Sequence, residues 1–196
     1  MDYLEVNRRN WDERARVHAG SPEYDLQRFR EDPGHLSDVV RYDLPRLGDI
    51  AGQRVVHLQC HIGTDTLSLA RLGAQVTGLD LSGESLQVAR DLAAGHVEYV
   101  QADVYRAREV LVGEFDLVYT GIGALCWLPD VNRWAQVVAS LLRPGGRLFI
   151  REGHPVLWSM DYDTPGELSI TYPYFTTAEP IIETVETSYA GADQTI

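Results

Sequence analysis

Residues 54–82 read RVVHLQCHIGTDTLSLARLGAQVTGLDLS and contain the strongest signal for the fold of this chain. It opens with a short apolar run at 55–58, which has the length and composition of a buried parallel strand. A loop at 59–63 leads into a helical pattern, and a second apolar run at 75–79 ends on Asp80. Strand, loop, helix, strand and terminal acid in this order predict a βαβ unit, in which the acid would hold a ribose diol.

The helix between the two strands has a clear beginning and end. Thr64 or Asp65 is the expected N-cap, because its side-chain oxygen can accept a hydrogen bond from a free backbone N–H. Gly73 follows the last apolar position and ends the helix. The apolar positions in between, which predict one buried face, are Leu67, Leu69, Ala70 and Leu72.

The loop of this unit bears on the choice of cofactor. A dinucleotide site favours G-x-G-x-x-G, so that bare backbone N–H groups can approach a pyrophosphate. The corresponding positions here are Gln59, His61 and Gly63, so a single glycine remains. Side chains would stand where a pyrophosphate needs backbone, and a cofactor without phosphates suits the loop better.

With this loop the chain resembles the class I S-adenosylmethionine-dependent methyltransferases, whose first motif is an acid followed by a glycine-rich loop. The segment HLQCHIGTDTLSLARLGA looks like a variant that replaces two of the glycines. His57 stands where the family usually has an acid, which leaves the customary role of that position open. The resemblance implies an α/β fold with a Rossmann-like, doubly wound, mostly parallel sheet.

Further motifs follow in the family's order. A strand at 97–100 leads to Asp103, which in the family faces the adenine amino group, although it could instead cap a helix at 104–111. A strand at 115–119 would end beside the transferring methyl group, where residues 120–128 read TGIGALCWL.

The second half of the core carries two more signals. Asp130 is the expected cap of a helix with an apolar stripe. The turn LRPGG at 142–146, followed by a strand at 147–151, resembles the same place in small-molecule methyltransferases. The resemblance therefore covers residues 54–151.

The resemblance implies a set of cofactor contacts in the loop and at the strand ends. These are His57, Gln59, Cys60, His61, Gly63, Asp80, Leu81, Asp103, Val104, Thr120 and Gly121. The cofactor would be S-adenosyl-L-methionine, with S-adenosyl-L-homocysteine as the product.

The chain is expected to form a single domain with three parts. Residues 1–50 carry helical patterns and would lie over the cofactor as a lid, residues 51–152 form the core, and residues 153–196 are a substrate-side tail. Trp11 and Tyr24 would line the lid or act as packing anchors.

The tail contains two alternating runs, 168–175 and 181–189, which predict a hairpin. The family closes its sheet with a further helix and an antiparallel pair of strands, and no such helix is evident before Ile196. Either the two runs stand in for these closing strands, or the strands belong to a missing C-terminal portion, and we expect the second. An open sheet edge would invite a partner such as a second copy of the chain.

Catalysis by such an enzyme requires an acceptor pocket and, for a hydroxyl acceptor, a base. His154 is the first candidate for the base because it follows the fifth strand; its alternative is a hydrogen-bonded loop residue before Pro155. His61 and Glu152 are weaker candidates. Aromatic residues in the lid, the loop after the fourth strand and the tail would wall the pocket: Trp11, Tyr24, Trp127 and Tyr172, with Trp158 and Tyr174 nearby.

Composition narrows the class of protein. The 196 residues carry a net charge of −12, and all 17 basic residues are arginine, so a nucleic-acid substrate is not expected. No apolar run reaches the roughly 20 residues that span a bilayer. Cys60 and Cys126 are expected to be reduced thiols in a cytoplasmic enzyme. No metal is expected, because the strand and loop that carry His57 and His61 do not place them as a zinc pair.

The sequence thus predicts methyl transfer to oxygen or nitrogen of a small-molecule acceptor. Two alternatives stay open: an NAD(P)-type oxidoreductase, which shares the βαβ unit and Asp80, and a non-catalytic module that binds S-adenosylmethionine.

Overall fold

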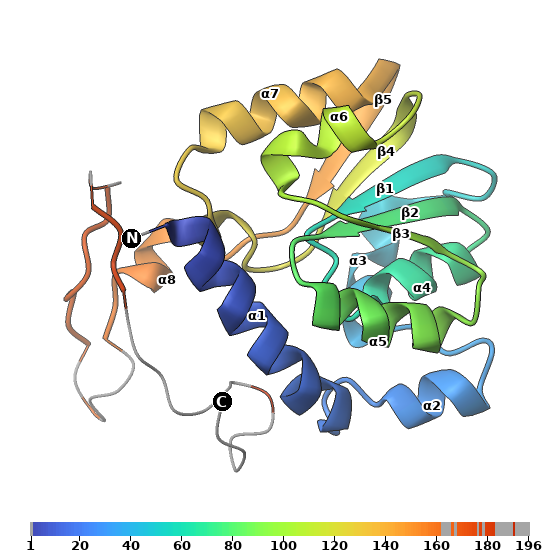
Figure 1. The fold of residues 1–196 in the computed structure, drawn as a ribbon, viewed down its shortest axis with the longest axis horizontal. Coiled ribbons are helices and arrows are strands. Elements are labelled where there is room, and N and C mark those ends of the chain that lie inside the picture. Colours follow the sequence, from blue (N-terminus) through green and yellow to red (C-terminus); the bar gives the residue numbers. More distant parts are fainter. Residues whose placement is uncertain are drawn as a thin grey trace.

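The computed structural model describes residues 2–161, 166, 168–175, 177, 179–182 and 190, and its centre is a parallel sheet of five strands (Figure 1). The strands are β1 (Arg54–Leu58), β2 (Gln75–Asp80), β3 (Glu98–Gln101), β4 (Phe115–Thr120) and β5 (Leu142–Ile150). They lie in the order β3-β2-β1-β4-β5. The chain therefore builds outward from β1 to β3 and then returns to the other side of β1. This reversal leaves a crevice between β1 and β4 at the carboxyl ends of the strands, where open α/β sheets bind ligands.

Helices cover both faces of the sheet, so the predicted doubly wound α/β fold is confirmed. They are α1 (Tyr3–Gly20), α2 (Leu26–Glu31), α3 (Asp38–Leu47), α4 (Thr64–Arg71), α5 (Gly83–Ala93), α6 (Ala107–Val110), α7 (Val131–Leu141) and α8 (Pro155–Trp158), with short 3-10 turns at Val104–Arg106 and Leu125–Trp127. In Figure 1, α6 and α7 lie on one face of the sheet, and α3, α4 and α5 lie on the other.

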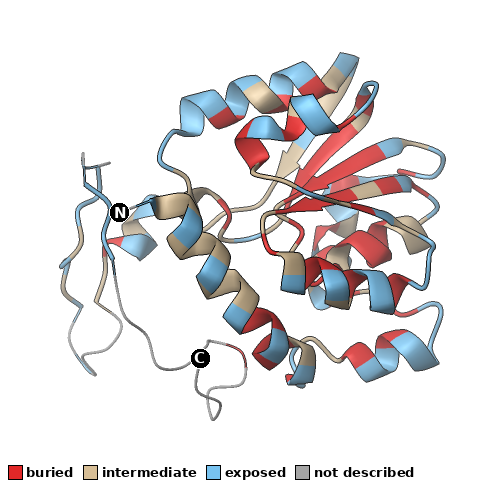
Figure 2. Ribbon diagram, in the orientation of Figure 1, coloured by how far each residue is buried: buried red, intermediate tan, exposed pale blue. Residues whose placement is uncertain are grey.

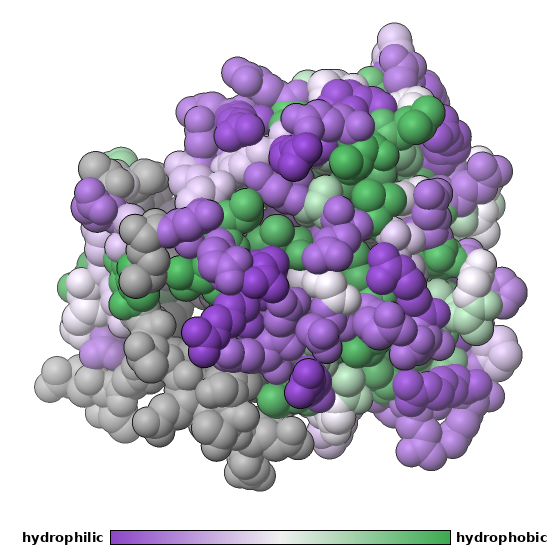
Figure 3. Space-filling view, viewed as in Figure 1, coloured by the Kyte–Doolittle hydropathy of each residue, from purple (hydrophilic) through white to green (hydrophobic). Residues whose placement is uncertain are grey.

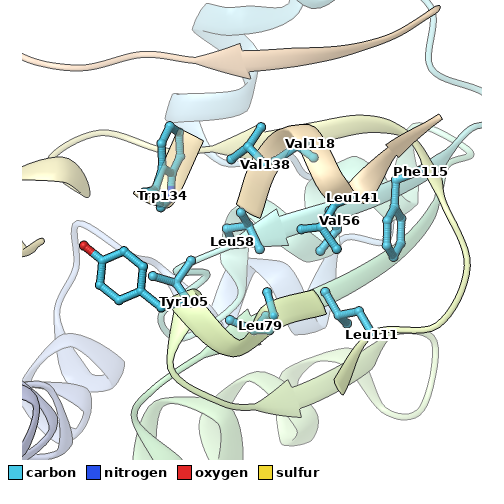
Figure 4. Packing of buried hydrophobic residues seen from close by; sticks show 12 residues of the cluster. Val56, Leu58, Leu79, Tyr105, Leu111, Phe115, Val118, Trp134, Val138 and Leu141 are labelled. Carbon is cyan, nitrogen blue, oxygen red and sulfur yellow. The ribbon is translucent and has the colours of Figure 1, made fainter. Parts of the chain in front are cut away.

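The central strands are buried because alternate side chains enter two different cores (Figure 2). Figure 4 shows the first core, in which Val56 and Val118 of the sheet pack toward Trp134 and Val138 of α7. On the other face, residues such as Tyr119 pack with α3 and α4. β1 and β4 are thus apolar on both faces, as a central parallel strand requires.

Side-chain caps explain where several helices begin. Ser82 accepts from the Ser85 N–H at the start of α5, and Asp130 accepts from the Arg133 N–H at the start of α7, which confirms the Asp130 prediction. The prediction for α4 is wrong, because its N-cap is Gly63 and no side chain caps it. Asp65 is therefore free for another role.

The LRPGG turn lies inside β5 rather than before it. Leu142 pairs with Phe115, and the next pair is Arg147 with Leu117, so four residues of β5 oppose one residue of β4. The predicted turn is this irregularity, and regular pairing resumes at Arg147, where the strand was expected to begin.

The prediction of a hairpin in the tail is wrong for its first half. Residues 168–175 form no strand and make only an isolated antiparallel bridge, between Ile170 and Met160. Most of the second run, 183–189, lies outside the described residues. Among the described residues, no further strand pairs with β5.

The N-terminal helices are attached to the core by specific contacts. Asp12 of α1 accepts from the Ser82 hydroxyl at 2.7 Å and from the Glu84 N–H at 3.3 Å, so α1 is fixed to the start of α5. The outer surface over α1 and α2 is largely hydrophilic (Figure 3). No helix in the described part of the chain has the length and apolar character that crossing a membrane requires.

Candidate active site

A cavity of about 1100 Å³ lies at the carboxyl ends of β1, β2 and β4 and extends beneath α1. This exceeds the roughly 300–1000 Å³ that is usual for a pocket holding one drug-sized ligand. The predicted residues that line it are Trp11, Tyr24, His57, Gln59, Cys60, His61, Asp80, Leu81, Asp103, Val104, Gly121 and Trp127. The structure therefore brings together most of the residues that the sequence singled out, from segments more than 100 residues apart.

Four predicted site residues do not line the cavity, and each has another environment. Thr120 is completely buried at the end of β4, and Tyr172 lies in the tail with its N–H donating to the Ser159 carbonyl. Gly63 faces α5, and His154 is exposed.

Gly63 was predicted to let the cofactor approach the backbone, and the structure gives a different reason for the glycine. A Cβ at Gly63 would lie 2.6 Å from the Ala89 Cβ and 2.6 Å from the Tyr99 hydroxyl, and the residue has φ of +77°. The glycine is required by packing against α5 and β3 and by its left-handed backbone.

Two backbone N–H groups of the loop at 59–63 are hydrogen-bonded within the protein. Gln59 and His61 both have left-handed backbone, with φ of 57° and 50°, which is uncommon for residues with side chains. The His61 N–H donates to Asp80 Oδ2 at 2.7 Å, and the Gly63 N–H donates to the Cys60 carbonyl at 3.1 Å. These donors are therefore not available for a pyrophosphate, whereas a cofactor without phosphates does not need them.

Asp80 joins the loop to the start of α5. Its Oδ1 accepts from the Ser82 N–H at 2.8 Å, and its Oδ2 accepts from the His61 N–H. Burial raises the pKa of Asp80 to about 6, although these backbone hydrogen bonds oppose the shift. Each carboxylate oxygen has a second lone pair, so Asp80 keeps acceptor capacity for the two hydroxyls of a ribose.

We expect Asp80→Ala to weaken the binding of S-adenosylmethionine by about 1.5–3 kcal/mol, because charge-assisted hydrogen bonds to the ribose would be lost. Isothermal titration calorimetry measures the change. Asp91→Ala, on the outer side of α5, is the matched control and should leave the affinity unaltered. An unchanged affinity in a folded Asp80→Ala variant would place the ribose elsewhere.

Asp103 was given two alternative roles, and the structure bears out the cap. Its Oδ1 accepts from the Tyr105 N–H at 3.0 Å at the start of the 3-10 turn. Asp103 also lines the cavity beside Leu81 and Val104, so its contact with an adenine amino group stays a prediction.

Aromatic side chains from α1 and from the loop after β4 form one wall of the cavity. The Trp11 ring of α1 makes edge contacts with Trp127, at a centroid distance of 5.3 Å, and with His61, at 5.0 Å. The Asn7 side chain donates to the Trp127 carbonyl at 3.1 Å. Both proposed roles of Trp11, lining and packing, are therefore present in one residue.

The three candidate bases are each hydrogen-bonded within the protein. His154 is exposed, and its Nδ1 accepts from the Val156 N–H at 3.3 Å, as its alternative interpretation required. His61 has both ring nitrogens engaged, with Ser85 Oγ at 3.0 Å and His18 Nδ1 at 2.7 Å. These two histidines therefore have structural environments.

Glu152 has a different role, which the sequence did not reveal. Its Oε1 accepts from the N–H groups of Ala124 and Leu125 at 2.6 and 2.7 Å, and its Oε2 accepts from the Gly123 N–H at 2.9 Å. An acid directly after β5 thus holds the loop after β4, and this loop carries Trp127. The sequence did contain one signal for this role. Glu152 directly follows the predicted fifth strand, and the loop after the fourth strand has backbone N–H groups that need acceptors.

The described residues contain no group of three or more His, Cys, Asp or Glu side chains that could hold a metal ion. His57 is buried, and its Nδ1 lies 2.9 Å from Thr66 Oγ1. Burial lowers the pKa of His57 to about 3, so the imidazole is neutral.

Comparisons with known proteins agree with this geometry. Residues 56–150 match a family model described as a methyltransferase domain. A ubiquinone biosynthesis O-methyltransferase from Xanthomonas oryzae pv. oryzae (strain PXO99A) is 41% identical over 126 residues, which cover 60% of this chain and 51% of the relative. Another from Erwinia tasmaniensis is 39% identical over 122 residues, which cover 60% of this chain and 50% of the relative. The chain thus spans about half the length of these curated relatives.

A solved structure shares the fold as well. The crystal structure of an S-adenosylmethionine-dependent methyltransferase from Mesorhizobium loti superposes with a TM-score of 0.52 and 32% identity, over 62% of this chain and 55% of that one. Residues 56–150 are therefore similar to a methyltransferase domain, and the chain shares its fold with an S-adenosylmethionine-dependent methyltransferase.

Proposed function

We propose that this chain transfers a methyl group from S-adenosyl-L-methionine to an oxygen or nitrogen atom of a small-molecule acceptor. The observation that carries the proposal is the cavity at the switch point between β1 and β4, with Asp80 at its β2 side and a loop in which the His61 N–H is already bound to Asp80. An NAD(P) cofactor fits this site poorly, because the His61 and Gly63 N–H groups, which a pyrophosphate would need, are already hydrogen-bonded within the protein.

The cofactor supplies a methyl group on a sulfonium, which is a good electrophile. The residues of the chain then have to orient the acceptor and exclude water. Trp11 and Trp127 are suited to both tasks, because they close the cavity from opposite segments and present ring faces and edges. With His61 and His154 engaged elsewhere, we assign the rate enhancement to positioning.

Oxygen is the preferred acceptor atom, and the support is the name of the curated relatives, which act as O-methyltransferases in ubiquinone biosynthesis. The aromatic wall agrees with a partly apolar acceptor that carries a hydroxyl group. We further propose that a second copy of the chain pairs along the β5 edge, which sedimentation at several protein concentrations would test.

Ligand-dependent thermal stability tests the cofactor directly. S-adenosylmethionine and S-adenosylhomocysteine should each raise the melting temperature by mass action, and NADH should not. A shift with NADH alone would contradict the proposal. A screen of phenols, catechols and amines with a radiolabelled methyl donor then tests transfer, and stabilisation without transfer to any acceptor would favour a non-catalytic binding module.

The affinity for the cofactor should depend on pH through Asp80. Ribose hydroxyls donate to the ionised carboxylate, so binding favours the ionised form. With a pKa of about 6, Asp80 is ionised above that pH, where the affinity should be full, and it takes up a proton as the pH falls. Calorimetry should therefore give a plateau above about pH 7 and up to about a tenfold loss per pH unit below pH 6. In Asp80→Asn this contribution to the fall should be absent; an identical profile would assign the fall to other groups.

A further inference from the structure

A second acid, which is half-buried, lines the cavity on the side away from Asp80. Asp65, near the start of α4, faces the cavity together with Ser37 and His57. A Cβ on Gly121 would lie 3.7 Å from Asp65 Oδ2 and 3.9 Å from His57 Nε2. Because glycine has no Cβ, the acid, the imidazole and the Gly121 backbone border one small volume in the crevice between β1 and β4.

The charged groups around Asp65 leave an excess of negative charge. Asp43 is 1% exposed, accepts from the Tyr119 hydroxyl at 2.6 Å and lies 2.7 Å from Arg151 Nε. Arg151 is thus matched by Asp43, and Asp65 takes part in no ion pair of the described residues. The neutral His57 supplies no positive charge.

Burial is costly for the Asp65 carboxylate. Burial raises the pKa of Asp65 to about 6, and a hydrogen bond from Ser37 opposes this shift. The nearby Asp43 raises the pKa further, by more than Arg151 lowers it. A desolvated carboxylate without a cation is unfavourable, and a cation that enters the cavity would relieve this. The site is therefore prepared for a positively charged group of a ligand.

We propose that Asp65 is the counter-ion of the α-ammonium group in the methionine part of the cofactor. The proposal rests on the proposed function and names the part of the ligand that this subsite takes. Asp80 ends β2, and Asp65 stands beside the crevice between β1 and β4. The two acids thus occupy successive places along the carboxyl edge of the sheet, where the ribose and the amino-acid end of one elongated ligand would lie.

Calorimetry with two matched ligands tests the proposal. S-adenosylhomocysteine is compared with its deaminated analogue, in which hydrogen replaces the α-ammonium group. Wild-type protein should bind S-adenosylhomocysteine about 10–100-fold more tightly than the analogue, the range for one charge-assisted hydrogen bond. Asp65→Asn, which keeps the size of the side chain, should bind the two ligands within about threefold of each other. Asp103→Asn is the matched control and should retain the wild-type preference.

The outcomes separate this proposal from the proposed function. Equal affinities of wild type for the two ligands, or a full preference retained in Asp65→Asn, would overturn the counter-ion role and leave the proposed function standing. Failure of wild type to bind S-adenosylhomocysteine would overturn both. If Asp65→Asn does not fold, the ligand pair on wild type still decides, because the preference for the ammonium needs no variant.

Discussion

Glu152→Ala is expected to lower the hydrogen-exchange protection of the amides at 123–125 by about 100-fold and to lower methyl transfer by a similar factor. The carboxylate accepts three backbone N–H bonds from this segment. Each hydrogen bond to a charged group contributes about 1.5–3 kcal/mol, and water can replace part of this in a half-buried loop, which leaves about 3 kcal/mol for the set. Transfer falls with protection because the same loop carries Trp127 over the cavity.

Two further variants make the test specific. Glu152→Gln keeps one acceptor oxygen for Ala124 and Leu125 but directs an amide N–H toward Gly123, so an intermediate loss is expected. His154→Ala, two residues along the chain, should leave both measurements within about twofold. Unchanged protection in Glu152→Ala would mean that the loop is held by other contacts, and a large loss of transfer in His154→Ala would restore that residue as a base.

The core of the fold followed from the sequence because its signals are local. The apolar runs of β1 and β2 and the acid Asp80 occur within one continuous stretch, and parallel strands buried on both faces have a distinctive composition. Asp130 could be assigned as a cap for the same reason, since a cap needs only the next three residues.

The site was harder to predict wherever a residue's role depends on a distant segment. Glu152 looked like a weak base because its three partners lie 27 to 29 residues earlier on another strand end. Asp65 looked like an N-cap, and only the structure places it beside His57 and a cavity. His154 was favoured for its position after the fifth strand, but an adjacent Pro155 starts α8 and makes it a cap on the surface.

Gly63→Ala is expected to lower the free energy of unfolding by about 3 kcal/mol in the absence of any ligand. The left-handed backbone at φ of +77° costs an alanine about 1–2 kcal/mol, and the new methyl group would lie 2.6 Å from both Ala89 and Tyr99, where overpacking costs a further 1–3 kcal/mol. For a chain of this size the melting temperature should fall by roughly 6–12 °C. Gly63→Val should be more severe, because two additional methyl groups would enter the same space.

Gly95→Ala separates the two contributions. Gly95 has a similar backbone, with φ of +87°, but a Cβ there would meet nothing within 4 Å. This control should therefore lose only the backbone contribution, about 1–2 kcal/mol, and urea unfolding of the two variants measures the difference. Equal losses would show that the contact between the loop and α5 can relax. In that case the predicted clash is not what requires glycine at position 63. Reduced cofactor affinity in a stable Gly63→Ala variant would instead indicate that Gly63 contacts the cofactor.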